Sequence, residues 1–129
     1  MNRYEMTLTV QPEDIDEQGH VNNIRYLQWV QDISRAHWCG EQQKNLSREY
    51  AWVARSHYIE YKRPAYLGDR LLVVTWIEKL EGFLSHRRVE VRNADSNRLL
   101  VSALTQWCLY DLHTKRPMRI PQEILQLLE

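Results

Sequence analysis

The most chemically suggestive stretch of the chain runs from residue 14 to residue 26 and reads DIDEQGHVNNIRY. Two carboxylates and a histidine stand directly ahead of a run that is predicted to be helical from Asn23. A helix N-terminus offers free backbone N–H groups and a partial positive charge, which can stabilise an oxyanion. A carboxylate one loop upstream, such as Asp16, can act as a base on water or attack a carbonyl directly. These are the two requirements for hydrolysis at a carbonyl carbon.

The same residues also have a purely structural interpretation. Asp and Asn are the most common N-cap residues, and acidic residues near a helix start are favoured by the helix dipole. Asn22 or Asn23 can therefore be a helix cap, and DIDEQG can be a solvated turn. For Asp14 we expect stabilisation of this turn rather than chemistry.

A strand and a long helix are expected to position this stretch. Residues 4–10 alternate between apolar and polar side chains, which predicts a half-buried strand that Pro12 ends. In residues 23–39 polar side chains recur every three or four positions and apolar ones fill most of the remainder, which predicts a helix with one narrow polar stripe. We expect a sheet to wrap around a helix that is apolar over most of its circumference.

Four β-type runs follow the helix, and their connections contain proline, glycine and turn-forming polar residues. Short connections predict antiparallel neighbours. The runs cover residues 51–63, 71–80, 83–93 and 99–111, and a short helix is expected at Gln122–Leu128 after Pro121. The expected fold is α+β, a single domain over residues 1–129 in which a five-stranded antiparallel sheet surrounds a long central helix.

The motif D-x-D-x-x-G-H-V-N-N-x-x-Y, in this order of elements, resembles the hotdog-fold acyl-CoA thioesterases. The nearest groups are the 4-hydroxybenzoyl-CoA thioesterase-like enzymes and the acyl-carrier-protein thioesterases. The motif residues are Asp14, Asp16, Gly19, His20, Val21, Asn22, Asn23 and Tyr26. The likeness continues through YLQW and IEYKRPAYLGDRLLV, so it covers most of the chain. It implies hydrolysis of an acyl-CoA or acyl-carrier-protein thioester to a carboxylic acid and a thiol.

The resemblance also implies roles for individual residues. Asp16 aligns with the catalytic carboxylate of the family, which acts either as general base on water or as a nucleophile that forms a mixed anhydride. The N–H of Asn23 aligns with the position that binds the carbonyl oxygen. Gly19 permits the tight turn and close approach of the substrate. His20 and Asn22 are expected to orient the water or the acyl group.

Coenzyme A brings phosphates, so its binding rim is expected to carry arginine or lysine. The segments YKRPAY and SHRRVEV qualify, and from them Arg63 and Arg88, together with Tyr26 on the helix, are the candidate substrate-binding residues. Arg87 and Arg88 point to opposite faces of a strand, so at most one of them serves a given site. Solvated surface charge is the structural alternative for these arginines.

One position departs from the acyl-carrier-protein enzymes that share HVNN. Those enzymes have an asparagine two residues before the histidine and a glutamate on a later strand. Here the first position is Gln18, and Glu60 is the nearest candidate for the second. This departure favours the single-carboxylate scheme of the 4-hydroxybenzoyl-CoA-type enzymes.

Composition excludes several other classes. Lysine plus arginine and aspartate plus glutamate both total 17, so the chain has no basic excess for nucleic acid. It has no long apolar run and no apolar segment near residue 1, so we expect a cytoplasmic protein without a membrane partner. Cys39 and Cys108 lack CxxC spacing and are expected to be reduced and buried. No histidine has metal-ligand spacing, so we expect no metal and no cofactor apart from the coenzyme A of the substrate.

Two further expectations concern assembly and competing functions. One such layer leaves a strand edge unpaired, which predicts a homodimer or homotetramer. A hydratase or dehydratase on the same fold, with His20 as base, and a non-catalytic acyl-CoA-binding module remain as alternatives. The sequence does not predict which acyl group the protein accepts, because strand register decides which aromatic side chains face a pocket.

Overall fold

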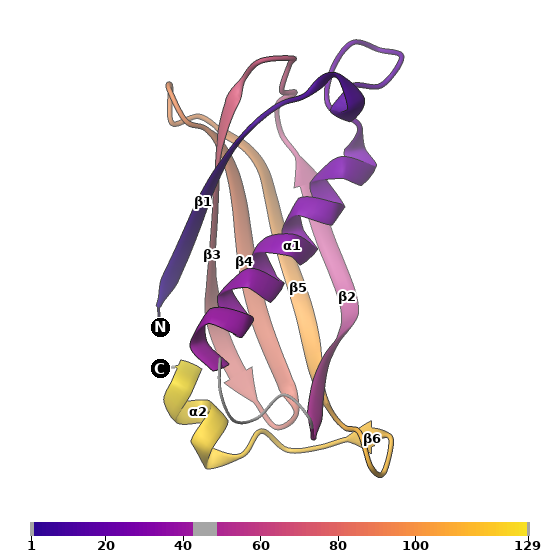
Figure 1. Cartoon of the computed structure of the whole chain (residues 1–129), viewed down its shortest axis with the longest axis vertical. Coiled ribbons are helices and arrows are strands. Elements are labelled where there is room, and N and C mark those ends of the chain that lie inside the picture. Colours follow the sequence, from indigo (N-terminus) through magenta and orange to yellow (C-terminus); the bar gives the residue numbers. More distant parts are fainter. Residues whose placement is uncertain (1, 43–48, 129) are drawn as a thin grey trace.

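The computed structural model describes residues 2–42 and 49–128, in which one antiparallel sheet curls around the long helix α1, Asn23–Gln42 (Figure 1). The sheet has the strand order β1-β3-β4-β5-β2, and the short β6 pairs with β5. The strands are β1 (Arg3–Thr9), β2 (Tyr50–Tyr61), β3 (Arg70–Glu81), β4 (Leu84–Asn93), β5 (Leu99–Asp111) and β6 (Arg116–Pro117). A 3-10 turn, η1 (Pro12–Asp14), and a final helix, α2 (Gln122–Leu128), complete the described elements.

The α+β class, the antiparallel sheet and the long central helix are confirmed, and β5 and α2 have the bounds predicted from the sequence. The helix continues past residue 39 to Gln42. Strand β2 ends at Tyr61, because the N–H groups of Lys62 and Arg63 both donate to the Leu100 carbonyl and turn the chain away from the ladder. A two-residue strand carries no hydrophobic alternation, so the sequence does not predict β6.

Helix and sheet meet through one buried face each. Val30 and Ile33 are fully buried on the sheet side of α1, with Trp29 beside them. Every second residue of β4 is buried, and Val89 and Val91 pack in the same hydrophobic cluster as the helix residues. The alternation of the strand and the helical period therefore place both apolar faces in one core.

The opposite side of α1 is the predicted polar stripe. Gln28, Asp32 and Arg35 are exposed there. Cys39 is exposed too, which corrects the expectation that both cysteines are buried, while Cys108 is buried. The reason is helical spacing, since Cys39 follows Arg35 by four residues and continues the stripe. In the described part of the chain, no helix is both long and apolar enough to span a membrane.

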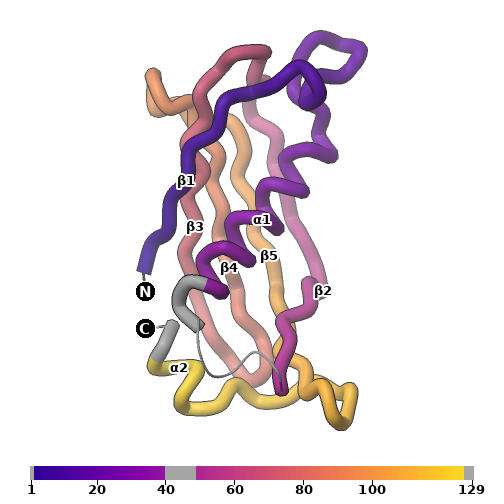
Figure 2. Tube along the Cα trace, viewed as in Figure 1, coloured from indigo at the N-terminus to yellow at the C-terminus, as the bar shows by residue number. Residues whose placement is uncertain are grey.

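The two ends of α1 contact different parts of the chain (Figure 2). The loop of residues 10–22 and the connection after β2 lie at its first turn, whereas α2 lies at its far end. A helix of this length spans roughly 30 Å. Features at the first and last turns of α1 are therefore well separated in space.

We expect the substitution Ile33→Ala to lower the free energy of unfolding by about 2–5 kcal/mol, because it leaves a cavity in the core. Ile33 is 0% exposed. The matched control is Ile24→Ala on the same helix, where the side chain is 74% exposed and the expected loss is about 0.5 kcal/mol or less. Urea denaturation measures both values. Equal losses would contradict the burial pattern of α1.

Candidate functional site

A buried carboxylate fixes the loop between β1 and α1. Asp14 is 3% exposed, and its Oδ1 accepts a hydrogen bond from Arg25 Nε at 2.6 Å while its Oδ2 accepts one from the Gln11 N–H at 2.8 Å. Its carbonyl oxygen accepts the Asn22 N–H at 2.9 Å. These bonds join the beginning and end of the loop to the first turn of α1. This is the structural role expected of Asp14, but the sequence gives no signal for Arg25 as its partner.

Asp16 opens a tight turn within that loop. Its N–H donates to the His20 carbonyl at 2.9 Å, and its Oδ1 accepts the Gln18 N–H at 2.9 Å. Gly19 has a φ of +87°, a conformation that side-chain-bearing residues rarely adopt, and a Cβ there would meet nothing within 4 Å. The glycine is therefore required for the turn itself rather than for space. The second oxygen of Asp16, Oδ2, has no hydrogen-bond partner among the described residues.

The start of α1 presents one free donor. Asn22 is the cap, since its Oδ1 accepts the Ile24 N–H at 3.0 Å and its carbonyl accepts the Arg25 N–H at 2.9 Å. The N–H of Asn23, the first residue of the helix, has no acceptor within residues 2–42 and 49–128. Asn22 thus caps the helix, as the structural interpretation expected. The backbone N–H of Asn23, which the resemblance aligns with the carbonyl-binding position, is free to donate.

A cleft of about 210 Å³ opens between this helix start and the end of β2. Its lining brings together His20, Asn23, Tyr26 and Arg63 from the predicted site residues, and adds Val21, Tyr61, Lys62 and Pro64. Asp16, Gly19 and Asn22 belong to the neighbouring loop and do not line the cleft. Sequence reasoning does not single out Lys62, and it leaves open which strand aromatics face a pocket.

Two tyrosines form the aromatic wall of the cleft. Tyr26 is 2% exposed, and its ring centroid lies 5.8 Å from that of Tyr61. Burial raises the pKa of Tyr26 to about 12, although the Ala65 backbone lowers it, and the phenol oxygen has no hydrogen bond of regular geometry in the described chain. The Tyr61 hydroxyl donates to the Asn23 carbonyl at 3.4 Å. Tyr26 therefore remains a neutral phenol at physiological pH and keeps a hydrogen bond to offer.

The charges around the cleft are basic on one side. Arg63 and Lys62 are exposed at its rim, at the end of β2. Arg88 lies elsewhere, on the outer face of β4, where it donates to Glu78 at 3.0 Å and to Ser102 at 3.2 Å. Arg87 is buried on the helix side of the same strand, so the predicted opposition of the two arginines is observed. The structure does not bring Arg88 to the cleft.

His20 is half-buried, and its Nδ1 lies 3.4 Å from the Val21 carbonyl. No ion pair joins it to a carboxylate in the described part of the chain. Glu60, the candidate for a second acid, is an exposed residue of β2. Its Oε2 lies 3.9 Å from Lys62 Nζ, and it does not line the cleft. Within the described residues, no three His, Cys, Asp or Glu side chains are grouped as metal ligands.

Comparisons with known proteins find relatives over nearly the whole chain. The profile of the family described as the thioesterase-like superfamily matches residues 10–128. The long-chain acyl-CoA thioesterase FadM of Escherichia coli K12 is 26% identical over 120 residues, which are 89% of this chain and 89% of that protein.

Solved structures agree on the fold. Slr0204, a 1,4-dihydroxy-2-naphthoyl-CoA thioesterase from Synechocystis, matches with a TM-score of 0.86 at 23% identity, covering 98% of this chain and 96% of that one. The probable thioesterase YbaW from Escherichia coli matches with a TM-score of 0.85 at 25% identity, covering 97% and 96%. These matches confirm the hotdog fold expected from the motif and the order of elements.

We expect Asp14→Asn to destabilise the protein by about 1–3 kcal/mol, because the new amide group turns a donor toward either Arg25 or the Gln11 N–H. The matched control is Asp16→Asn, the same change two residues away, which is expected to cost about 1 kcal/mol or less because Asp16 is only half-buried and an amide oxygen can still accept the Gln18 N–H. Thermal and urea unfolding compare the two variants. A larger loss for Asp16→Asn would show that Asp14 is not the anchor of the loop.

Proposed function

The chain belongs to the thioesterase-like superfamily and is a hotdog-fold thioesterase, and from this we propose that it hydrolyses acyl-CoA thioesters to a carboxylic acid and coenzyme A at the first turn of α1. One observation carries the choice of site. The Asn23 N–H is free among the described residues, and Asp16 lies in the loop that hydrogen bonds tie to this helix start. These are the oxyanion donor and the base or nucleophile that the reaction requires.

In the proposed reaction the thioester carbonyl oxygen accepts the Asn23 N–H, and the positive end of the helix dipole stabilises the charge that develops on it. The free Oδ2 of Asp16 takes a proton from water, and the hydroxide adds to the carbonyl carbon. The tetrahedral intermediate then breaks its C–S bond, and the coenzyme A thiolate leaves and takes up the proton from Asp16. In the alternative route Asp16 itself attacks the carbonyl carbon, the C–S bond breaks and the thiolate leaves. Water then hydrolyses the mixed anhydride and returns the Asp16 carboxylate. Both routes end in the same acid and thiol.

Substrate binding is supported by the walls of the cleft. Tyr26 and Tyr61 form an apolar slot for the pantetheine arm and the beginning of the acyl group, and the unpaired Tyr26 hydroxyl can donate to an oxygen of the substrate. Arg63 and Lys62 at the rim suit the phosphates of coenzyme A. An acyl-carrier-protein thioester presents the same arm with a single phosphate. The acyl-CoA name of the Escherichia coli relative favours coenzyme A.

The competing functions lack comparable support. A dehydratase needs His20 as an oriented base, and the described residues provide no carboxylate bonded to its ring. A binding module would use the same cleft without releasing a thiol. We propose that the reaction uses no cofactor, since coenzyme A enters only as part of the substrate.

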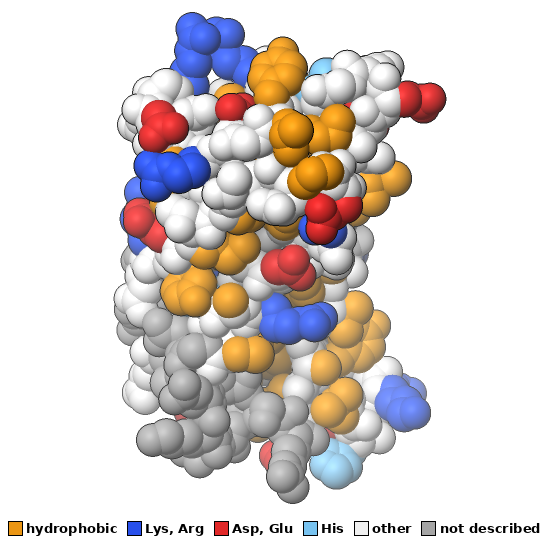
Figure 3. Space-filling view, turned by 45° about the horizontal axis from the view of Figure 1, so that its top comes forward, with side chains coloured by type: hydrophobic (Ala, Val, Ile, Leu, Met, Phe, Trp, Pro, Cys, Tyr) orange, Lys and Arg blue, Asp and Glu red, His pale blue; other side chains and the backbone are white. Residues whose placement is uncertain are grey.

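We also propose that two copies associate through the edge strand β2. Among the described residues only β5 pairs with β2, which leaves its other edge open there. Val53, Tyr58 and Tyr61 are large exposed apolar or aromatic side chains on this strand. Figure 3 shows hydrophobic side chains gathered on the surface toward the end where α1 begins. Tyr61 also lines the cleft, so a second copy on this edge would border the site. Pairing two edges removes open backbone groups and buries this surface.

Asp16→Asn is expected to lower kcat by about 100-fold or more with little change in KM, because the amide can neither take a proton nor attack. The readout is thiol release from a panel of aryl and aliphatic acyl-CoAs, which also identifies the preferred acyl group. The matched control is Glu17→Gln, an exposed acid in the same turn, which should stay near the native rate. An active Asp16→Asn variant would remove the carboxylate from the mechanism, and binding without thiol release by the native protein would favour the non-catalytic module.

Analytical ultracentrifugation is expected to give a molar mass of twice the chain mass of 15.6 kDa or a higher multiple of it. Tyr58→Lys, which puts a charge on the open edge, should shift the equilibrium toward the monomer. Tyr66→Lys is the control, since Tyr66 is similarly exposed but lies outside the strand. A monomeric native protein at assay concentrations, or equal behaviour of both variants, would contradict association through β2.

A further inference from the structure

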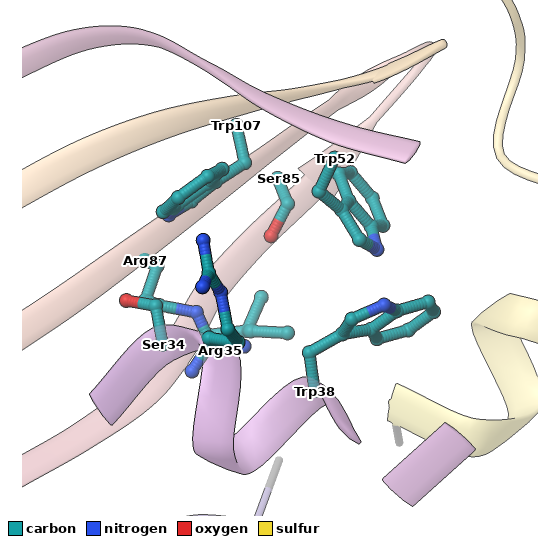
Figure 4. Close-up of a pocket in the computed structure, with 8 residues that line it drawn as sticks. Ser34, Arg35, Trp38, Trp52, Ser85, Arg87 and Trp107 are labelled. Carbon is teal, nitrogen blue, oxygen red and sulfur yellow. The ribbon is translucent and has the colours of Figure 1, made fainter. Parts of the chain in front are cut away.

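A second cavity, of about 120 Å³, lies between the later turns of α1 and strands β2, β4 and β5. Figure 4 shows the three indoles of this cavity and Ser85 around a common space, with Arg35 and Arg87 on one side of it. The indoles belong to Trp38, Trp52 and Trp107. Trp38 and Trp52 meet edge to face with centroids 5.5 Å apart, which joins the helix to the edge strand.

This cavity is separate from the cleft at the helix start. The two share no lining residue, and Trp38 follows Asn23 by fifteen positions, or roughly 22 Å along the helix. Between them the helix face is filled by Trp29, Val30 and Ile33, which are at most 5% exposed. An acyl chain that starts at Asn23 would have to displace this packed core to reach the cavity. We therefore treat the cavity as a site of its own.

The cavity contains a buried cation without a matching anion. Arg87 is 4% exposed, and its Nη1 donates to His37 Nδ1 at 2.9 Å and to Thr75 Oγ1 at 3.1 Å. No carboxylate pairs with it in the described chain. Burial lowers the pKa of Arg87 to about 10, so it is still charged at neutral pH. Buried charges in proteins are normally paired, and the two hydrogen bonds of Nη1 leave further N–H groups of the guanidinium unused.

The tryptophans add two more unused donors. The indole nitrogens of Trp52 and Trp107 are buried and have no acceptor among the described residues. Arg35, which is exposed, brings a second cation to the same walls. Buried donors are almost always satisfied in folded proteins. The cavity is thus lined by two cations, three indoles, two serines and Ile77, and no carboxylate is among its described lining residues.

We propose that this cavity binds a small hydrophobic carboxylate, an ionised aryl or short-chain acid, with its carboxylate at Arg87 and its apolar part between the indoles. A guanidinium binds a carboxylate through two parallel hydrogen bonds, and indole faces suit a flat ring or a short chain. The volume of about 120 Å³ is close to the roughly 150 Å³ of an engineered cavity that binds benzene, so the apolar part of the ligand is limited to about one ring or a short chain. A neutral apolar guest would leave Arg87 without a counter-anion.

The site does not depend on the proposed hydrolysis, because binding is measured without turnover. The chemical class is nevertheless that of the acid released by a thioesterase. Occupancy by such an acid would make the cavity a place where the protein senses a product-like molecule away from its catalytic loop.

Tryptophan fluorescence tests the proposal, since three of the five tryptophans line the cavity. Native protein is titrated with benzoate and hexanoate, and with the neutral analogues benzamide and hexanol. We expect a saturable change with the carboxylates and binding about tenfold weaker or more with the neutral compounds. No saturable change, or equal binding of benzamide and benzoate, would overturn the proposal.

Matched variants locate the site. Arg87→Met should weaken carboxylate binding about tenfold or more, and Ser85→Leu, which fills the cavity, should abolish it. Arg88→Met on the outer face and Arg63→Met at the other cleft should leave it unchanged. If Arg87→Met fails to fold, the proposal is tested by the effect of Ser85→Leu on benzoate binding and by the comparison of benzoate with benzamide. Loss of binding in Arg63→Met but not in Ser85→Leu would place the ligand in the cleft and overturn the proposal.

Discussion

The ion pair between the buried Asp14 and the half-buried Arg25 is the interaction on which the proposed catalytic geometry depends. Each oxygen of Asp14 is held by a donor, one from the helix and one from the beginning of the loop. A buried charge has few alternative arrangements, because water cannot replace a lost hydrogen-bond partner and the loss destabilises the fold. The loop is therefore held in register with the first turn of α1. The Asp14–Arg25 ion pair therefore fixes where the Asp16 carboxylate and the Asn23 N–H lie relative to each other, because no contact joins those two groups directly in the described chain.

The rest of the architecture divides the helix into two environments. Near its start, an exposed basic rim and two tyrosines border a cleft, and the loop that carries Asp14 and Asp16 leads into it through His20 and Val21. Toward its end, bulges at Ala54/Ser56 in β2 and Ile77/Lys79 in β3 interrupt the ladders, and the wall side chains enclose a cavity instead of closing over the helix. Val30 and Ile33 separate the two environments. One element of secondary structure thus supports two chemically different concave surfaces.

The sequence predicts more of the scaffold than of the site, for physical reasons. Strand alternation and helical period are local signals, so the long helix, the antiparallel sheet, and the opposite faces of Arg87 and Arg88 all follow from them. The motif likewise leads to Asn23 as the free donor. Tyr61 and Lys62 reach the cleft only because β2 pairs with β5, a pairing that depends on register across distant strands. Alternation puts Arg87 on the face of Val89 and Val91, but its partners His37 and Thr75 depend on how distant segments pack.

The position of β2 at the edge of the sheet has a consequence for how the molecule is assembled in time. Its partner is β5, and Ser56 and Gln106, which bond across this pair, are 50 residues apart in the chain. Contacts between distant segments form slowly, because a long loop must close before any of them is gained. On the ribosome, β2 is made well before the strand that it needs. Tyr61 is thus synthesised early but packs late, so the aromatic wall of the cleft is completed only when β5 has emerged. Until then the apolar side chains of β2 are exposed and the strand can aggregate.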